Sequence, residues 1–290
     1  MTGINIISNA VSLTGTSVEA SNASVANASQ SAVDVLGNGS GVDFTMAFIV
    51  ISIIVSVAIP LAVIFWGKIK LKGSLLQILS GVACFIVFKL FLANIFCNII
   101  MPNFSDQDNS SFDICLSIII GVVFTAAGRW LFMFLSRKKR KDVGNPVLFA
   151  AGMTIMEAFI VLFFILIPYL AVASGGDGTT EYESLRVFVT SGNLVEGEEW
   201  RFLIKGYTVI IFAMLQIYTA VLTFTAVQKK MFWPISIAVM FELLVLLPNR
   251  MHELDMWYWG NNVVIIAYLG IISVIGCFVA YSTQSKKVSD

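Results

Sequence analysis

The sequence predicts an all-α polytopic membrane helix bundle of about seven transmembrane helices, with the N-terminus outside and the C-terminus inside. Composition is the first indication, because 58% of the 290 residues are hydrophobic, only 12% are charged and the mean hydropathy is +0.87. Soluble domains carry about 25% charged residues. Long apolar runs and an alternation of charge between the connecting loops are the second and third indications.

Seven apolar runs approach the roughly 20 residues that a helix needs to cross a bilayer. The sixth run is the shortest, and we expect its helix to end at Pro248. The runs cover residues 44–66, 74–99, 114–135, 147–172, 203–227, 232–248 and 260–282.

Cations concentrate in alternate connections between these runs. The loops at 67–73, 136–142 and 228–230, together with the C-terminal tail, hold twelve of the eighteen Lys and Arg residues. The intervening loops are poor in cations or acidic. Because short basic loops stay on the cytoplasmic side, the pattern predicts an exterior N-terminus and a cytoplasmic C-terminus.

Three regions follow from these boundaries. Residues 1–43 are rich in Ser, Asn, Ala and Gly and lack a basic segment followed by an apolar one, so they predict a flexible Ser/Asn-rich exterior tail rather than a signal peptide. Residues 44–283 form the transmembrane helix bundle. Residues 284–290 form a short cytoplasmic tail. We expect a multi-pass protein of the cell (plasma) membrane.

The sequence predicts no cofactor, no metal site and no nucleic-acid partner. The formal net charge is zero, which argues against a nucleic-acid surface. The four cysteines show neither a CxxC motif nor a Cys/His spacing typical of zinc. Cys97 and Cys115 both fall near the predicted outer face, so they form either a disulfide or two small buried hydrophobic side chains.

Five polar side chains lie well inside the predicted spans and form a candidate intramembrane layer. An ionisable group at the centre of a lone membrane helix costs roughly 2.5 to 3.5 kcal/mol on insertion scales, so such groups face the bundle interior and find partners. At 1.5 Å per residue, the five positions lie about 9 to 22 Å from the cytoplasmic ends of their helices. The layer comprises Lys89, Arg129, Glu157, Gln216 and Glu242.

Arg129 is expected to pair with Glu157, Glu242 or both, because a guanidinium keeps its charge in an apolar environment. Two interpretations of the layer stay open at this point. Buried ion pairs sometimes only fix helix register and packing. The layer is alternatively a functional site, either retained or modified.

Two of these positions lie in local motifs, Arg129 in "FTAAGRW" (124–130) and Glu157 in "GMTIMEA" (152–158). These motifs resemble those of the YhfC-type intramembrane proteases, which are related to the prenyl-protein and PrsW-type glutamic endopeptidases. The stretch "FTAAGRW" (124–130) resembles the family's F-E-E-x-x-G-R motif, with Thr125 and Ala126 in place of the paired glutamates. The stretch "GMTIMEA" (152–158) resembles G-H-G-G-x-E-A, with Met153 in the histidine position and Glu157 kept. The resemblance covers residues 45–285.

Gln216 and Glu242 correspond to the family's two later histidine positions. The resemblance implies a glutamate that activates water with the help of histidines, and Thr125, Ala126 and Met153 cannot do this. The only histidine, His252, falls in a predicted outer loop far from the layer. The resemblance therefore implies a protease scaffold whose catalytic set is lost, and we identify no catalytic residue.

The preferred function is thus an inactive intramembrane-protease-like protein that contacts the lipid bilayer and binds a membrane peptide or a lipid-modified protein partner. Whether the chain is an enzyme stays open, leaning toward a pseudoenzyme. One alternative is a transporter or channel subunit that uses the polar layer, since intramembrane carboxylates near cations are typical of ion routes. Another is an active peptidase with Glu157 or Glu242 as the general base.

Overall fold

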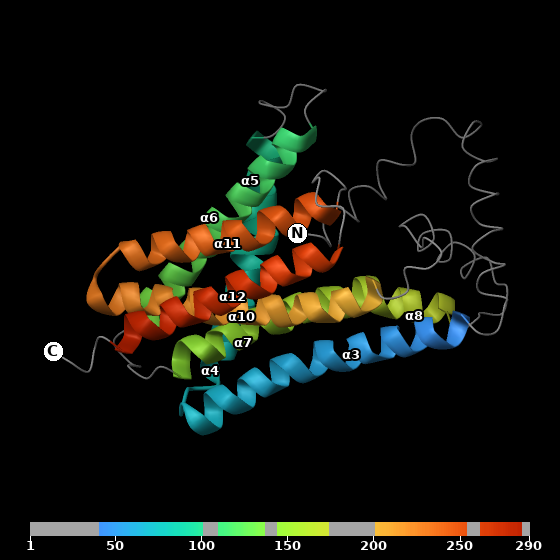
Figure 1. Cartoon of the computed structure of the whole chain (residues 1–290). Helices are drawn as coiled ribbons and strands as arrows, with labels where there is room; N and C mark the ends of the chain where they lie inside the picture. The colour runs from blue at the N-terminus through green and yellow to red at the C-terminus, as the bar shows by residue number, and fades with distance from the viewer. Residues whose placement is uncertain (1–40, 101–109, 137–143, 174–200, 254–261, 286–290) are drawn as a thin grey trace. The chain divides into compact units, whose positions relative to one another are not determined.

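The computed structural model describes residues 41–100, 110–136, 144–173, 201–253 and 262–285 (Figure 1). All of the regular structure in these ranges is helical. The helices are α3 (Gly41–Phe65), α4 (Leu76–Cys84), α5 (Ala93–Ile100), α6 (Ser110–Ser136), α7 (Gly144–Val161), α8 (Ile167–Ala173), α10 (Arg201–Lys229), α11 (Trp233–Glu253) and α12 (Asn262–Ser285). Three π-helical stretches continue or join them, namely η1 (Trp66–Lys70), η2 (Phe85–Leu92) and η4 (Leu162–Leu166).

Six continuous helices are long and apolar enough to cross a membrane, and each agrees with a predicted run to within about four residues. They cover Met46–Lys70, Leu76–Ile99, Cys115–Ser136, Gly144–Ala171, Phe202–Lys229 and Val264–Thr283. The remaining predicted run corresponds to α11, whose apolar part, Trp233–Asn249, is shorter. The prediction of a polytopic membrane helix bundle is confirmed. Residues 1–40 of the predicted tail lie outside the described residues.

Helix α11 corrects one predicted boundary, because it continues through Pro248 to Glu253. The proline lacks an N–H group, so the carbonyl of Leu244, four residues earlier, loses its usual partner. The hydroxyl of Tyr268 on α12 donates a hydrogen bond to this carbonyl at 3.2 Å. A side chain of the neighbouring helix thus satisfies the group that the proline leaves free, and the backbone at His252 is helical rather than part of a loop.

The chain forms two compact units. The first comprises the described parts of Met1–Ala58 and Ala158–Val209. Within it, the Ser52 hydroxyl of α3 donates to the Phe202 carbonyl of α10 at 2.6 Å, and Gly206 allows Ser52 to lie close to that helix. The rings of Tyr169 and Phe202 meet edge to face at 5.0 Å. These contacts join α3, α8 and the start of α10.

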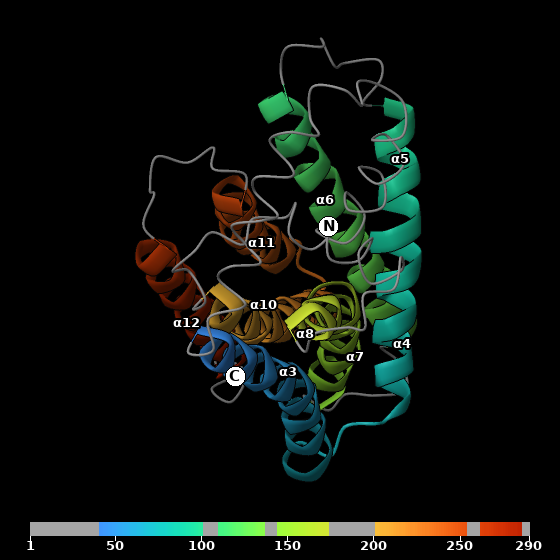
Figure 2. The ribbon, with the colours of Figure 1, turned by 90° about the vertical axis from the view of Figure 1, so that its right-hand side faces the viewer.

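The second unit comprises Ile59–Glu157 and Ile210–Asp290 and contains all five residues of the predicted polar layer. The segment η2 joins α4 and α5 into one continuous long helix. Helix α6 packs along this helix (Figure 2). Helix α11 packs against both α6 and α12. The polar layer residues therefore lie on neighbouring helices of one unit.

Two glycines bring α4 and α7 into backbone contact inside the second unit. A β-carbon at Gly81 would overlap the carbonyl oxygen of Phe149, and one at Gly152 would overlap the carbonyl oxygen of Ile78. Small residues at helix interfaces are typical of membrane proteins, because they permit this close approach. The reciprocal pair fixes the spacing of α4 and α7, and Glu157 lies on α7 little more than one turn beyond Gly152.

We expect Gly81→Val and Gly152→Val each to lower the melting temperature of the protein in lipid nanodiscs by about 5 °C or more, because the added atoms meet backbone that has no room to yield. Leu79→Val is the matched control, since Leu79 lies on the same helix and is 66% exposed. Equal melting temperatures for Gly81→Val and Leu79→Val would contradict the close packing of α4 and α7.

Candidate functional site: a buried ion-pair network

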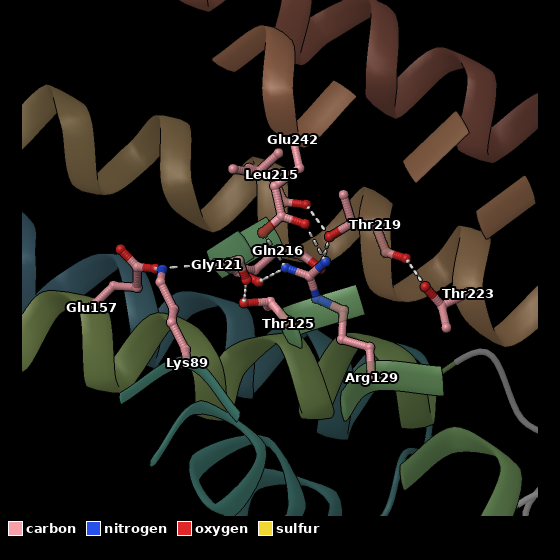
Figure 3. Close-up of polar contacts among 10 residues, drawn as sticks. All are labelled: Lys89, Gly121, Thr125, Arg129, Glu157, Leu215, Gln216, Thr219, Thr223 and Glu242. Carbon is pink, nitrogen blue, oxygen red and sulfur yellow. Dashed lines mark hydrogen bonds and ion pairs between the residues drawn. The ribbon is translucent and has the colours of Figure 1, made fainter. Parts of the chain in front are cut away.

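Arg129 lies on α6, and its side chain is completely buried. Its guanidinium binds the Glu242 carboxylate of α11 through two parallel hydrogen bonds, 2.6 Å from Nη1 to Oε2 and 2.9 Å from Nη2 to Oε1 (Figure 3). This two-pronged geometry is the strongest that an arginine forms with a carboxylate. Of the two acidic partners that the sequence left open for Arg129, the structure selects Glu242.

Lys89 and Glu157 form the second ion pair of the network. The ammonium of Lys89, on η2, donates to Oε1 of Glu157, on α7. The same ammonium lies 4.8 Å from the centre of the Phe85 ring, one turn earlier on η2, which adds a cation–π attraction. Both side chains retain a small exposure of 8–9%, whereas those of Arg129 and Glu242 retain 0–1%.

Gln216 on α10 connects the two ion pairs. Its side-chain carbonyl accepts a hydrogen bond of 2.8 Å from Nη2 of Arg129, and its amide nitrogen donates to Oε1 of Glu157 at 3.4 Å. An amide carries an acceptor and a donor on one planar group, so it can face a cation and an anion at once. The five predicted residues therefore form one connected network, and it contains two positive and two negative charges.

The three positions that the resemblance assigned to lost catalytic groups lie beside this network on α6 and α7. Thr125 is buried, and its hydroxyl donates to the Gly121 carbonyl of its own helix at 2.6 Å. Ala126 and Met153 are buried apolar side chains. None of the three contributes a polar contact to the charged groups of the network in the described part of the chain.

One polar residue near the network, Tyr218, was missed by the sequence reasoning. Tyr218 lies on α10 two residues after Gln216, and its ring packs edge to face against Phe241, at 5.6 Å, next to Glu242 on α11. A tyrosine of a membrane helix normally lies at the interface. The position of Tyr218 in the middle of a predicted span, rather than at its end, was therefore the sequence feature that could have identified it.

All four cysteines lie in the described part of the chain. Cys97 and Cys115 are free thiols, as are Cys84 and Cys277, so the possible disulfide is not formed. Within the described ranges, no three His, Cys, Asp or Glu side chains are grouped so that they could hold a metal ion.

Comparisons with protein families, curated proteins and solved structures find no match for this chain. The geometry defines the class only as a polytopic membrane protein with a buried ion-pair network.

Arg129→Met and Glu242→Met should each destabilise the protein strongly, because each leaves one charge buried without its partner. The expected cost is about 3 to 5 kcal/mol, or roughly 10 °C in melting temperature. The double variant Arg129→Met/Glu242→Met should melt at a higher temperature than either single variant, since a pair of apolar side chains leaves no charge exposed to the apolar interior.

Thermal unfolding in nanodiscs measures this difference, and expression level provides a second readout if a single variant does not fold. The control is Lys89→Met combined with Glu242→Met, which leaves Arg129 and Glu157 without their direct partners. A double variant Arg129→Met/Glu242→Met whose loss equals the sum of the two single losses would contradict the pairing.

Proposed function

We propose that this chain is an intramembrane-protease-like protein of the cell membrane that lacks hydrolytic activity and acts by binding a membrane peptide or a lipid-modified protein. The observation that carries the proposal is the engagement of both intramembrane carboxylates, Glu157 and Glu242, by buried cations. The motif resemblance of "FTAAGRW" and "GMTIMEA" to YhfC-type proteases supplies the protease-like part of the proposal.

A glutamate that activates water needs an oxygen within hydrogen-bond reach of that water. Both oxygens of Glu242 accept hydrogen bonds from Arg129. Oε1 of Glu157 accepts from both Lys89 and Gln216. To act as a base, Glu242 would have to exchange its charged partner for water, which leaves a buried cation uncompensated and costs several kcal/mol. Glu157 would have to act while its Oε1 stays bonded to Lys89 and Gln216.

The groups that would assist such a base are also missing. Thr125 gives its hydroxyl hydrogen to its own helix, and Ala126 and Met153 carry no group able to transfer a proton. These features support a binding role over peptide hydrolysis.

The apolar outer surface favours an occupant from the membrane. Long apolar side chains on α4, η2 and α5 are exposed, among them Leu79, Phe91 and Ile99. Such side chains contact lipid, and they suit the apolar side chains of a membrane peptide or the hydrocarbon of a lipid-modified protein equally well. A partner dissolved in water would gain little from them.

We expect the purified protein in nanodiscs to cleave neither membrane peptides nor prenylated peptides, as judged by mass spectrometry of the products. Wild type, Glu157→Gln and Glu242→Gln should give identical peptide spectra, because Arg129 holds Glu242, Lys89 holds Glu157, and Thr125, Ala126 and Met153 replace the groups that would assist a base. Cleavage by the wild type that disappears in Glu157→Gln would overturn the proposal and favour an active peptidase with a rearranged glutamate site.

A transporter or channel subunit is the second candidate, and the continuity of the network favours it. Lys89, Glu157, Gln216, Arg129 and Glu242 follow one another through hydrogen bonds across five helical segments. Intramembrane ionisable groups often mark ion routes. However, a guanidinium does not give up its proton in a protein, so Arg129 cannot relay protons along this chain.

Proteoliposomes with an imposed pH gradient and a pH-sensitive dye test this second candidate. We expect the same proton flux for wild type, Glu242→Gln and protein-free liposomes, because Arg129 interrupts the chain and holds Glu242. A wild-type flux that is abolished in Glu242→Gln would establish transport instead.

A further inference from the structure

Two buried hydroxyl groups in the second unit lack hydrogen-bond partners among the described residues. They belong to Tyr218 on α10 and Ser273 on α12, whose relative exposures are 1% and 0%. A buried hydroxyl without a partner costs about 1 to 3 kcal/mol. Only one further side-chain atom in the described ranges shares this condition, namely Nε of Arg129, whose other nitrogens are bound.

Ser273 differs from the other buried serines and threonines that the structure describes. Most of them donate to a carbonyl four residues earlier in their own helix, as Thr219 does to Leu215 and Thr225 does to Val221. Ser52 donates instead to another helix. Ser273 makes neither contact. Since this bond within the helix is available to almost any helical serine, its absence leaves the Ser273 hydroxyl free to bond a group outside its own helix.

The hydroxyl end of Tyr218 lies against the same part of α12. A β-carbon placed on Gly276 would lie 2.8 Å from both Cζ and Cε1 of the Tyr218 ring. Cζ is the atom that carries the hydroxyl. Ser273 precedes Gly276 by three residues, and positions three apart are neighbours on one helix face, about 5 to 6 Å from each other. Because Gly276 has no side chain, the hydroxyl-bearing end of the Tyr218 ring can lie against α12 about one turn from Ser273.

We propose that Tyr218 and Ser273 form a binding site for one buried water molecule that bridges α10 and α12. A water molecule offers two donors and two acceptors, and buried waters typically make about three hydrogen bonds to otherwise unpaired polar groups. The two hydroxyls supply partners from both helices. The water would thus bond α12 to α10, the helix that carries Gln216.

The test is a double-mutant cycle of Tyr218→Phe and Ser273→Ala, measured by thermal unfolding of the full chain in nanodiscs. Each single variant should lower the melting temperature by about 3 °C, because the water loses a partner. The double variant should lose clearly less than the sum, since both changes remove the same bridge. Tyr218→Phe that leaves the melting temperature unchanged or raises it would overturn the proposal, as would fully additive losses.

Thr225→Val is the matched control, because the Thr225 hydroxyl is buried on the same helix but bonds within it. Its loss should add to that of Ser273→Ala. A direct bond between Tyr218 and Ser273 would also produce coupling, so a high-resolution crystal structure separates the two cases. Density for a water within hydrogen-bond distance of both hydroxyls supports the proposal, and a direct contact between the two oxygens overturns it.

Discussion

The neutralisation of Arg129 is the constraint on which the interior of the second unit depends. A lysine or a glutamate can change its charge to suit an apolar environment, but a guanidinium remains charged. Arg129 is the largest of the completely buried side chains in the described ranges, and Glu242 and Gln216 surround its terminal nitrogens. Helices α6, α10 and α11 must therefore keep the register that brings these three side chains together.

The two ion pairs have different environments. The Arg129–Glu242 pair is sealed and uses two parallel hydrogen bonds, so it is a rigid junction of α6 and α11. The Lys89–Glu157 pair is slightly exposed and is formed by a flexible side chain with one charged contact. Gln216 forms hydrogen bonds to both pairs, so the position of one pair constrains the position of the other. The same bonds that make the charges tolerable in the interior also engage both carboxylates.

Four residues of the two sequence motifs lie at positions that the packing and the charges of the bundle constrain. Gly128 and Gly152 match the family motifs, and each lies at a close contact: a β-carbon at Gly128 would lie 2.6 Å from the Phe88 ring, and one at Gly152 would overlap the backbone of α4. Arg129 and Glu157 match as well, and both are members of the network. These two glycines and two charged residues are thus positions that packing and charge neutralisation constrain in this bundle.

The sequence by itself determined the membrane class, the extents of the spans and the identity of the five polar residues. Apolar length and intramembrane charge are properties that each helix carries alone, so they can be derived without knowing its neighbours. The tertiary structure alone decided that Arg129 binds Glu242 while Lys89 binds Glu157, and that Tyr268 allows α11 to continue past Pro248. Such choices depend on which faces of helices far apart in the sequence meet. In this unit Gly81 and Gly152 contribute by allowing α4 and α7 to pack closely.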